Sequence, residues 1–423
     1  MKLPSLRVER ALQLLPDIDA LVPLRAFLVS ASRGGRTVAE PYGTVGKRVV
    51  QPTDLRAFIP RAVSRLADHL SALYESAVDA LEAEERGDLV GSINALIAAG
   101  EREERAGRPA SARAWYAHAL RIAEELRDRH PEIQALRRLG RLDASRGEFD
   151  LAGRFYQRGF ALAEAEQDRQ SAALACHGLG QIAAAQRQWA GAISWYTRGL
   201  QFVAEESPLA ADLRLALAEV SRQQGETRAA DDWLDQAQRL FRNIGEPEGM
   251  ARALNARGQL DSDSGNRYRA FARYHEALAG LPAGLHPEVE MEIRLNLANL
   301  HIAQGRLPDA EDEIRRAEEL AIAHNLTRQL AQLYTVLGRV RGSQGDEAGF
   351  VFFEKAIELC RGREPEPDVE AAAYLEYAKF RRGLGELDEC RAYLCRAQEL
   401  TTDSGDAEVR ARIEAELAEV GVG

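Results

Sequence analysis

The chain has 423 residues, of which 45% are hydrophobic and 29% are charged, the balance of an ordinary folded protein. Its 55 Lys and Arg residues and 66 Asp and Glu residues give a formal net charge of −11. Phosphate binding needs clustered positive charge, so this acidic balance argues against nucleic acid and anionic membranes as main partners.

Residues 1–57 differ from the rest of the chain in charge and in pattern. Residues 1–60 hold nine Lys or Arg and five Asp or Glu, which leaves a net charge near −15 for the remainder. A short helical pattern at about 17–30 precedes a Gly- and Pro-containing stretch with little apolar periodicity. We predict a basic segment made of a short helix and a loop, partly disordered. The opposite net charges lead to the hypothesis that residues 31–52 fold back into the acidic body and occupy the groove.

The first twenty residues also bear on localisation. Charged residues interrupt them, so they do not match a signal peptide, and no stretch reaches the roughly 18 apolar residues of a membrane span. The four cysteines have no C-x-x-C spacing, so we read them as buried structural thiols. We expect a cytoplasmic protein without membrane insertion.

Residues 58–87 read as one long amphipathic helix that begins near Pro60. Its apolar residues recur at helical spacing, as in Val63, Leu66 and Leu70. A stack of repeats needs a cap at each end, because a terminal repeat has no neighbour to cover its apolar face. We predict an N-terminal capping helix that packs on the first repeat.

Between residues 88 and 401 a glycine–alanine–aromatic pattern recurs about every 40 residues. The first copy reads Gly100, Gly107, Ala112, Tyr116 and Ala119. A fixed period of this length indicates a stacked repeat architecture. Eight copies can be counted by their turn residues, which are Gly107, Gly147, Arg187, Gly225, Gly265, Gly305, Gly345 and Gly385.

Each period contains two amphipathic helical patterns separated by a turn. We expect the turn glycine to take the left-handed conformation that ends a helix. A second glycine lies in the middle of the first helix, where glycine costs about 1 kcal/mol relative to alanine. Its recurrence at Gly100, Gly140, Gly180, Gly258 and Gly338 predicts close packing between helices, with the aromatic residue beside it.

Three copies depart from this pattern. The fourth has Ala218 and Leu234 in place of the mid-helix glycine and the aromatic, and the sixth has Ala298 and Ile314. The seventh is one residue short after its turn, if Phe353 is taken as its aromatic position.

This skeleton, L-G/A…G…A…Y/F…A, resembles the tetratricopeptide repeat (TPR) family over roughly residues 88–401. The 40-residue spacing is longer than the usual 34 and is similar to the long-helix branch that includes kinesin light chain, LGN/Pins-type adaptors and bacterial Rap-type peptide sensors. The resemblance implies an all-α fold, a right-handed superhelical solenoid of eight helix–turn–helix repeats. It also implies that the first helix of each repeat lines a concave groove.

The last segment, 402–423, reads as a charged C-terminal capping helix. Asp406 is a plausible start, and Val409, Ile413 and Leu417 form an apolar stripe at helical spacing.

The chain has no sequence signature of catalysis. It lacks the H-E-x-x-H, G-x-S-x-G and EF-hand motifs, and the residues after Gly43 (GTVGKR) have the wrong spacing for a phosphate-binding loop. The eight histidines are scattered without ligand spacing. We therefore predict a protein that is not an enzyme and has no cofactor and no metal.

Candidate binding residues are those three positions before and one position after the mid-helix glycine or alanine, which share a helix face. Arg137, Arg141 and His177, with Gln181 beside them, form a candidate anion site, because guanidinium groups bind carboxylate or phosphate in a forked geometry. Asn255, Gln259 and Asn299 form an amide row able to pair with a peptide backbone. Arg339 occupies the same register in the seventh copy. A plainer interpretation is a solvated helix face, with Arg137 paired to Glu101.

We therefore expect a non-enzymatic adaptor or scaffold that binds a protein or peptide segment in its groove. Two alternatives stay open: a regulatory sensor that responds to a peptide or an anion, and an assembly or secretion chaperone. The sequence does not give the oligomeric state.

Overall fold

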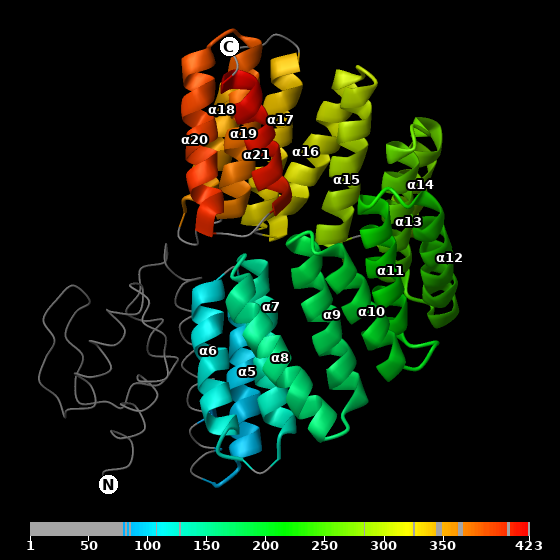
Figure 1. The fold of residues 1–423 in the computed structure, drawn as a ribbon, viewed down its shortest axis with the longest axis vertical. Helices are drawn as coiled ribbons and strands as arrows, with labels where there is room; N and C mark the ends of the chain where they lie inside the picture. The colour runs from blue at the N-terminus through cyan, green and yellow to red at the C-terminus, as the bar shows by residue number, and fades with distance from the viewer. Residues whose placement is uncertain are drawn as a thin grey trace, which may run out of the picture. The chain divides into compact units, whose positions relative to one another are not determined.

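The computed structural model describes residues 79–80, 83, 86–106, 108–126, 128–282, 284–324, 326–343, 349–362, 367–403 and 407–421. Within these residues the chain forms 17 helices and no strand (Figure 1). The predictions for residues 1–57 and for most of the capping helix 58–87 lie outside the described residues, as do the turn residues Gly107 and Gly345.

The described helices form eight consecutive pairs followed by a single helix, so the described chain is an all-α solenoid of TPR-like helix–turn–helix repeats. The pairs are α5 (Leu89–Arg105) and α6 (Pro109–Ala123), α7 (His130–Ser145) and α8 (Phe149–Ala165), α9 (Arg169–Ala185) and α10 (Trp189–Phe202), α11 (Pro208–Gln223) and α12 (Thr227–Ile244), α13 (Pro247–Asp263) and α14 (Arg267–Gly280), α15 (Pro287–Ala303) and α16 (Leu307–His324), α17 (Thr327–Ser343) and α18 (Gly349–Cys360), and α19 (Pro367–Gly383) and α20 (Leu387–Asp403). The single helix is α21 (Ala407–Gly421).

The chain divides into two compact units, one ending at Leu142 and the other beginning at Asp143. In the first unit α5 packs against α6. The second unit holds α8 to α21. From α9 onward within this unit, each second helix packs on the first helix of its own repeat and on the helix that follows it. The first helices of consecutive repeats also contact each other, so they lie on the inner side of the stack within this unit.

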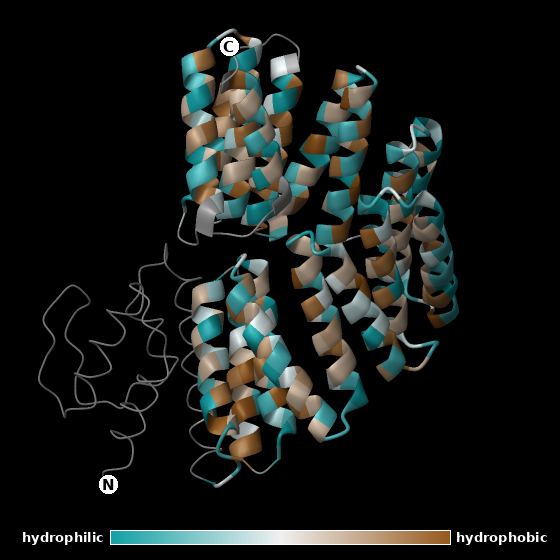
Figure 2. Ribbon diagram, in the orientation of Figure 1, coloured by the Kyte–Doolittle hydropathy of each residue, from teal (hydrophilic) through white to brown (hydrophobic). Residues whose placement is uncertain are grey.

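Local sequence explains where the helices begin and end. The side chains of Asp168 and Ser207 accept hydrogen bonds from the backbone N–H three residues later and so cap α9 and α11. Proline fills the first turn of α11, α13 and α15, where its missing N–H costs nothing. In Figure 2 the turns are mostly hydrophilic, whereas hydrophobic residues recur along the helices.

The predicted left-handed turn residues are confirmed. Each described glycine at the turn within a repeat has a φ between +70° and +82°; these are Gly147, Gly225, Gly265, Gly305 and Gly385. Arg187 takes the same conformation with a φ of +57°, although it carries a side chain.

Four of the five predicted mid-helix glycines pack against the aromatic residue of their own repeat. A Cβ atom at Gly258 would lie 2.5 Å from the ring of Tyr274 and would collide with it. Cβ atoms at three further glycines would collide in the same way with the aromatic residue of their own repeat; the pairs are Gly100 with Tyr116, Gly180 with Tyr196, and Gly338 with Phe353. Phe353 is fully buried, which confirms the shortened seventh repeat.

Where the glycine is replaced by alanine, the aromatic is replaced by an aliphatic residue. Ala218 and Leu234 are both buried in one apolar cluster. Ala298 and Ile314 share another cluster, and Ala378 and Leu394 share a third. The volume added on the first helix is therefore balanced by volume removed from the second helix.

The C-terminal helix packs as predicted. Val409 and Ile413 of α21 are buried in the apolar cluster of the eighth repeat, and Leu417 packs against it. The interpretation of the cysteines is confirmed for Cys176, Cys360 and Cys390, which are buried, and is wrong for Cys395, which is exposed.

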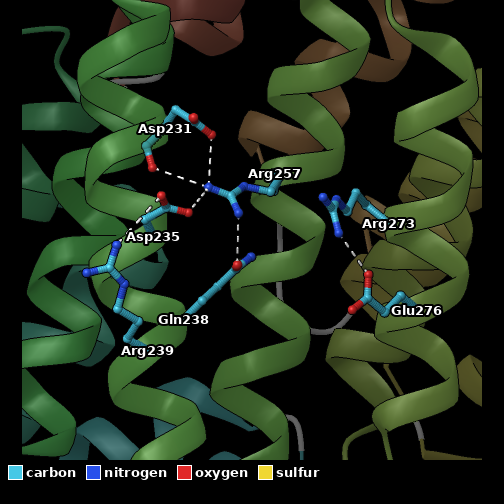
Figure 3. Close-up of polar contacts among 7 residues, drawn as sticks. All are labelled: Asp231, Asp235, Gln238, Arg239, Arg257, Arg273 and Glu276. Atoms are coloured by element: carbon cyan, nitrogen blue, oxygen red, sulfur yellow. Dashed lines mark hydrogen bonds and ion pairs between the residues drawn. The ribbon is translucent and has the colours of Figure 1, made fainter.

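A network of polar contacts joins α12 of the fourth repeat to α13 of the fifth (Figure 3). The Arg257 guanidinium donates hydrogen bonds to the carboxylates of Asp231 and Asp235, at 2.9 and 2.5 Å, and to the Gln238 side-chain oxygen at 3.0 Å. All three acceptors lie on α12, so one half-buried arginine ties this second helix to the next first helix.

Candidate functional site

The two predicted binding registers of the first helices differ in accessibility. One position after the mid-helix glycine or alanine, the side chains of Arg141, Gln181 and Arg339 are exposed and those of Gln259 and Asn299 are half-buried. Three positions before it, the four most buried residues are Ile97, Asn255, Thr335 and Leu375, all less than 9% exposed. For these four, the prediction of a solvent-facing register is wrong.

The geometry of the helix explains the difference. Successive residues rotate by about 100°, so the earlier register lies about 60° from the mid-helix glycine and the later register about 100° from it. The earlier register therefore points partly between helices, and the later one points outward. We refer to the later register on the first helices as the inner row.

In the first unit, the arginines of α7 pair with acidic residues of α5. Arg141 Nη2 lies 2.7 Å from Glu104 Oε2, which also accepts a hydrogen bond from the Tyr116 hydroxyl at 2.9 Å. Arg138 of α7 pairs with Glu101. Arg137 is half-buried. Because Arg137 and Arg141 belong to the first unit, whereas His177 and Gln181 belong to the second, the four-residue anion site stays a prediction.

His177 of α9 is half-buried, with its ring 5.9 Å from that of Tyr196. Burial lowers the pKa of His177 below its usual 6.5; the nearby Asp212 carboxylate opposes this shift and Arg252 adds to it. The imidazole is therefore uncharged near neutral pH. It can form a hydrogen bond with a ligand, but it does not supply a positive charge.

Asn255 of α13 joins two residues of α15. Its side-chain N–H donates to Glu292 Oε1 at 2.8 Å, and its oxygen accepts from the Asn296 amide at 2.9 Å. The Glu292 side chain is partly exposed, but the loss of solvation around its carboxylate raises its pKa, an effect that the hydrogen bond from Asn255 opposes and the charge of Glu219 increases. Both ends of the Asn255 amide are used inside the protein, so it cross-links adjacent first helices.

A second network links the first helices of the C-terminal repeats. Arg339 of α17 donates to the Asn299 side-chain oxygen at 3.3 Å and pairs with Glu376 of α19 at 3.4 Å. Glu376 also receives Arg412 of α21 at 2.6 Å. Asn299 and Arg339 are thus brought together, and their polar groups already engage each other.

The side-chain amides of Gln181 and Gln259 form no hydrogen bond with another described residue. Between them in the inner row lies Glu219 of α11, which pairs with Arg222 at 2.6 Å and leaves part of its surface exposed. The inner row thus presents one polar residue from each of four consecutive first helices, α9, α11, α13 and α15: Gln181, Glu219, Gln259 and Asn299.

Sequence reasoning missed most of the partners that organise this face. Arg252 pairs with Asp212 across α11 and α13, and Glu292 and Asn296 engage Asn255. The sequence does contain one signal for these pairs, which is their spacing: the partners lie 37 to 41 residues apart, about one repeat period.

Among the described residues, no group of three or more His, Cys, Asp or Glu side chains is arranged to hold a metal ion. No described helix is both long enough and apolar enough to span a membrane.

No family model matches the chain, and no curated protein matches it. Solved structures do match. A tetratricopeptide repeat protein from Parabacteroides merdae is 18% identical with a TM-score of 0.42, covering 67% of this chain and 98% of that one. A Rap protein complexed with Competence and Sporulation Factor is 14% identical with a TM-score of 0.49, covering 78% and 97%. The apo form of the quorum sensor NprR from B. thuringiensis is 11% identical with a TM-score of 0.46, covering 81% and 99%.

Proposed function

We propose that this protein is a non-enzymatic adaptor that binds an extended peptide or protein segment along the inner row of its second unit. One observation carries the proposal: the side-chain amides of Gln181 and Gln259 are accessible, on first helices of alternate repeats, and form no hydrogen bond with another described residue. An extended peptide presents N–H donors and C=O acceptors in alternation, and a carboxamide can satisfy both kinds of group.

The surrounding networks support a preformed surface. Asn255 and its partners on α15, and the Arg252–Asp212 pair between α11 and α13, hold neighbouring first helices in register. A ligand would therefore meet a row whose spacing is already fixed, which lowers the conformational cost of binding. Asn255 acts in this account as a positioning residue, because its own amide is fully engaged.

The test begins with a phage-displayed library of random linear peptides selected against the full chain. Affinities of the selected peptides are then measured by isothermal titration calorimetry for the wild type and for the double variant Gln181→Ala/Gln259→Ala. Two lost hydrogen bonds at about 1 kcal/mol each predict a loss of affinity of at least about tenfold. The matched control, Gln201→Ala/Gln398→Ala, removes two exposed glutamines from second helices and should bind as the wild type does.

Failure of the double variant to weaken binding, or equal weakening by the control, would refute the inner row as the binding site. Small-angle X-ray scattering on the same complexes separates the two ligand-binding alternatives. A static adaptor keeps its radius of gyration when the peptide binds, whereas a ligand-responsive sensor contracts or expands.

A further inference from the structure

Three consecutive exposed residues open the second helix of the fifth repeat: Arg267, Tyr268 and Arg269 of α14. The Tyr268 side chain is 88% exposed, a larger fraction than that of any other exposed large hydrophobic residue in the described part of the chain. Neither arginine forms an ion pair with a described residue. The Tyr268 ring and the charges of Arg267 and Arg269 thus face solvent and contribute little to the packing of the fold.

Phe271, one helical turn beyond Arg267 on the same side of α14, and Arg306 extend this surface toward the sixth repeat. Arg306, which precedes α16, places its guanidinium 5.6 Å from the centre of the Phe271 ring on α14. The His275 ring lies 4.2 Å from the same phenylalanine. We define the α14 patch as Arg267, Tyr268, Arg269, Phe271 and Arg306.

The charges around the α14 patch are not equally available. Arg273, one turn further along α14, is bonded to Glu276 at 3.0 Å (Figure 3). Arg306 has Asp309 at 3.7 Å. Arg269 faces the Asp261 carboxyl only at longer range, where its charge partly opposes the rise in the pKa of Asp261 that burial causes. Arg267 and Arg269 are therefore the cations best placed to pair with a partner.

We propose that the α14 patch docks an acidic segment of another protein. Arginine and tyrosine dominate the binding energy of protein interfaces, because a guanidinium binds a carboxylate in forked geometry and a phenol ring offers a large rigid contact. The charge distribution supports this choice of partner. A chain of net charge −11 repels an acidic segment over most of its surface, so an exposed pair of unpaired arginines orients the encounter. The α14 patch lies on a second helix, so this inference is independent of the inner row.

The probe is a short rhodamine-labelled peptide of Ser-Glu-Phe-Glu repeats, compared with versions in which Gln or Lys replaces Glu. Fluorescence anisotropy measures its binding to the full chain at low and at physiological salt. We expect the Glu peptide to bind at least about tenfold more tightly than the Gln peptide, with affinity falling as salt rises. Arg267→Ala/Arg269→Ala should reduce this affinity at least about tenfold and Tyr268→Ala at least about fivefold.

The matched control is Arg239→Ala/Arg242→Ala, which removes two exposed arginines from the adjacent second helix α12 and should leave binding unchanged. Equal binding of the Glu and Gln peptides, or equal loss in the control, would overturn the proposal. Two other outcomes would also overturn it by reassigning the patch. One is tighter binding of a single-stranded oligonucleotide than of the Glu peptide. The other is a concentration-dependent dimer in light scattering that Arg267→Ala/Arg269→Ala dissolves.

Discussion

Enlarging the mid-helix glycine of a repeat and shrinking the aromatic residue that packs on it tests the helix packing of this fold. In the fifth repeat, a Cβ atom at Gly258 would meet three ring atoms of Tyr274 at 2.5 to 2.9 Å. Gly258→Ala gains about 1 kcal/mol in helix propensity but forces the buried ring aside, which costs about 1–3 kcal/mol. We expect a net loss of up to about 2 kcal/mol in the free energy of unfolding.

The double variant Gly258→Ala/Tyr274→Leu tests whether the two positions compete for the same space. Tyr274→Leu alone leaves a space beside Gly258 and should cost about 2 kcal/mol. In Gly258→Ala/Tyr274→Leu the new methyl group occupies part of that space, as Ala218 does beside Leu234 in the fourth repeat. We expect the double variant to lose about 1 kcal/mol or less, which is a coupling of about 1–3 kcal/mol between the two positions.

Urea unfolding followed by circular dichroism measures overall stability, and hydrogen exchange in α13 and α14 reports the local effect. Gly153→Ala is the matched control, because a Cβ atom there meets no atom within 4 Å. This control should stabilise the chain by about 0.5–1 kcal/mol. Stabilisation by Gly258→Ala equal to that of the control, or simple addition of the two single-variant losses, would contradict close packing of Gly258 against Tyr274.

Three further predictions concern other positions. Gly225→Ala should destabilise by about 1 kcal/mol in urea unfolding, because its φ of +76° is left-handed although the space around it is open. Arg257→Ala should leave the Asp231 carboxylate without its cation and Asp235 with only the exposed Arg239 at 3.9 Å, and so speed hydrogen exchange in α12 and α13; Arg239→Ala, which removes only that exposed pair, is the control. Burial, and to a lesser extent Arg121, lowers the pKa of His118 from 6.5 to about 4. The unfolded chain therefore gains a proton in this range before the folded chain does, so stability should fall as pH drops from about 6.5 to 4 and His118→Gln should flatten that slope.

The repeat architecture could be predicted because its packing residues recur at fixed positions. The space between the two helices of a repeat is limited, so a small residue on the first helix goes with a large one on the second. Gly258 with Tyr274 and Ala218 with Leu234 are two such pairs. Even the shortened seventh repeat could be placed from Phe353. The same packing positions recur in every repeat, so a single sequence contains several examples of each.

The binding face was less predictable because one residue of error rotates a side chain by about 100°. Asn255 was assigned to the solvent face, yet it is 4% exposed and bridges two helices. The ion pair that the structure gives for Glu101 comes from Arg138, the neighbour of the predicted Arg137. Which of two neighbouring polar residues points across to the next helix depends on the rotation of that helix in the stack, and periodicity alone does not determine this rotation.

A crystal structure of the full chain with a selected peptide shows directly whether the inner row binds it. We expect an extended peptide on the first helices, with main-chain atoms within hydrogen-bonding distance, about 3 Å, of the side-chain amides of Gln181 and Gln259. A peptide bound to the second helices, or one that leaves both glutamines facing solvent, would contradict this expectation.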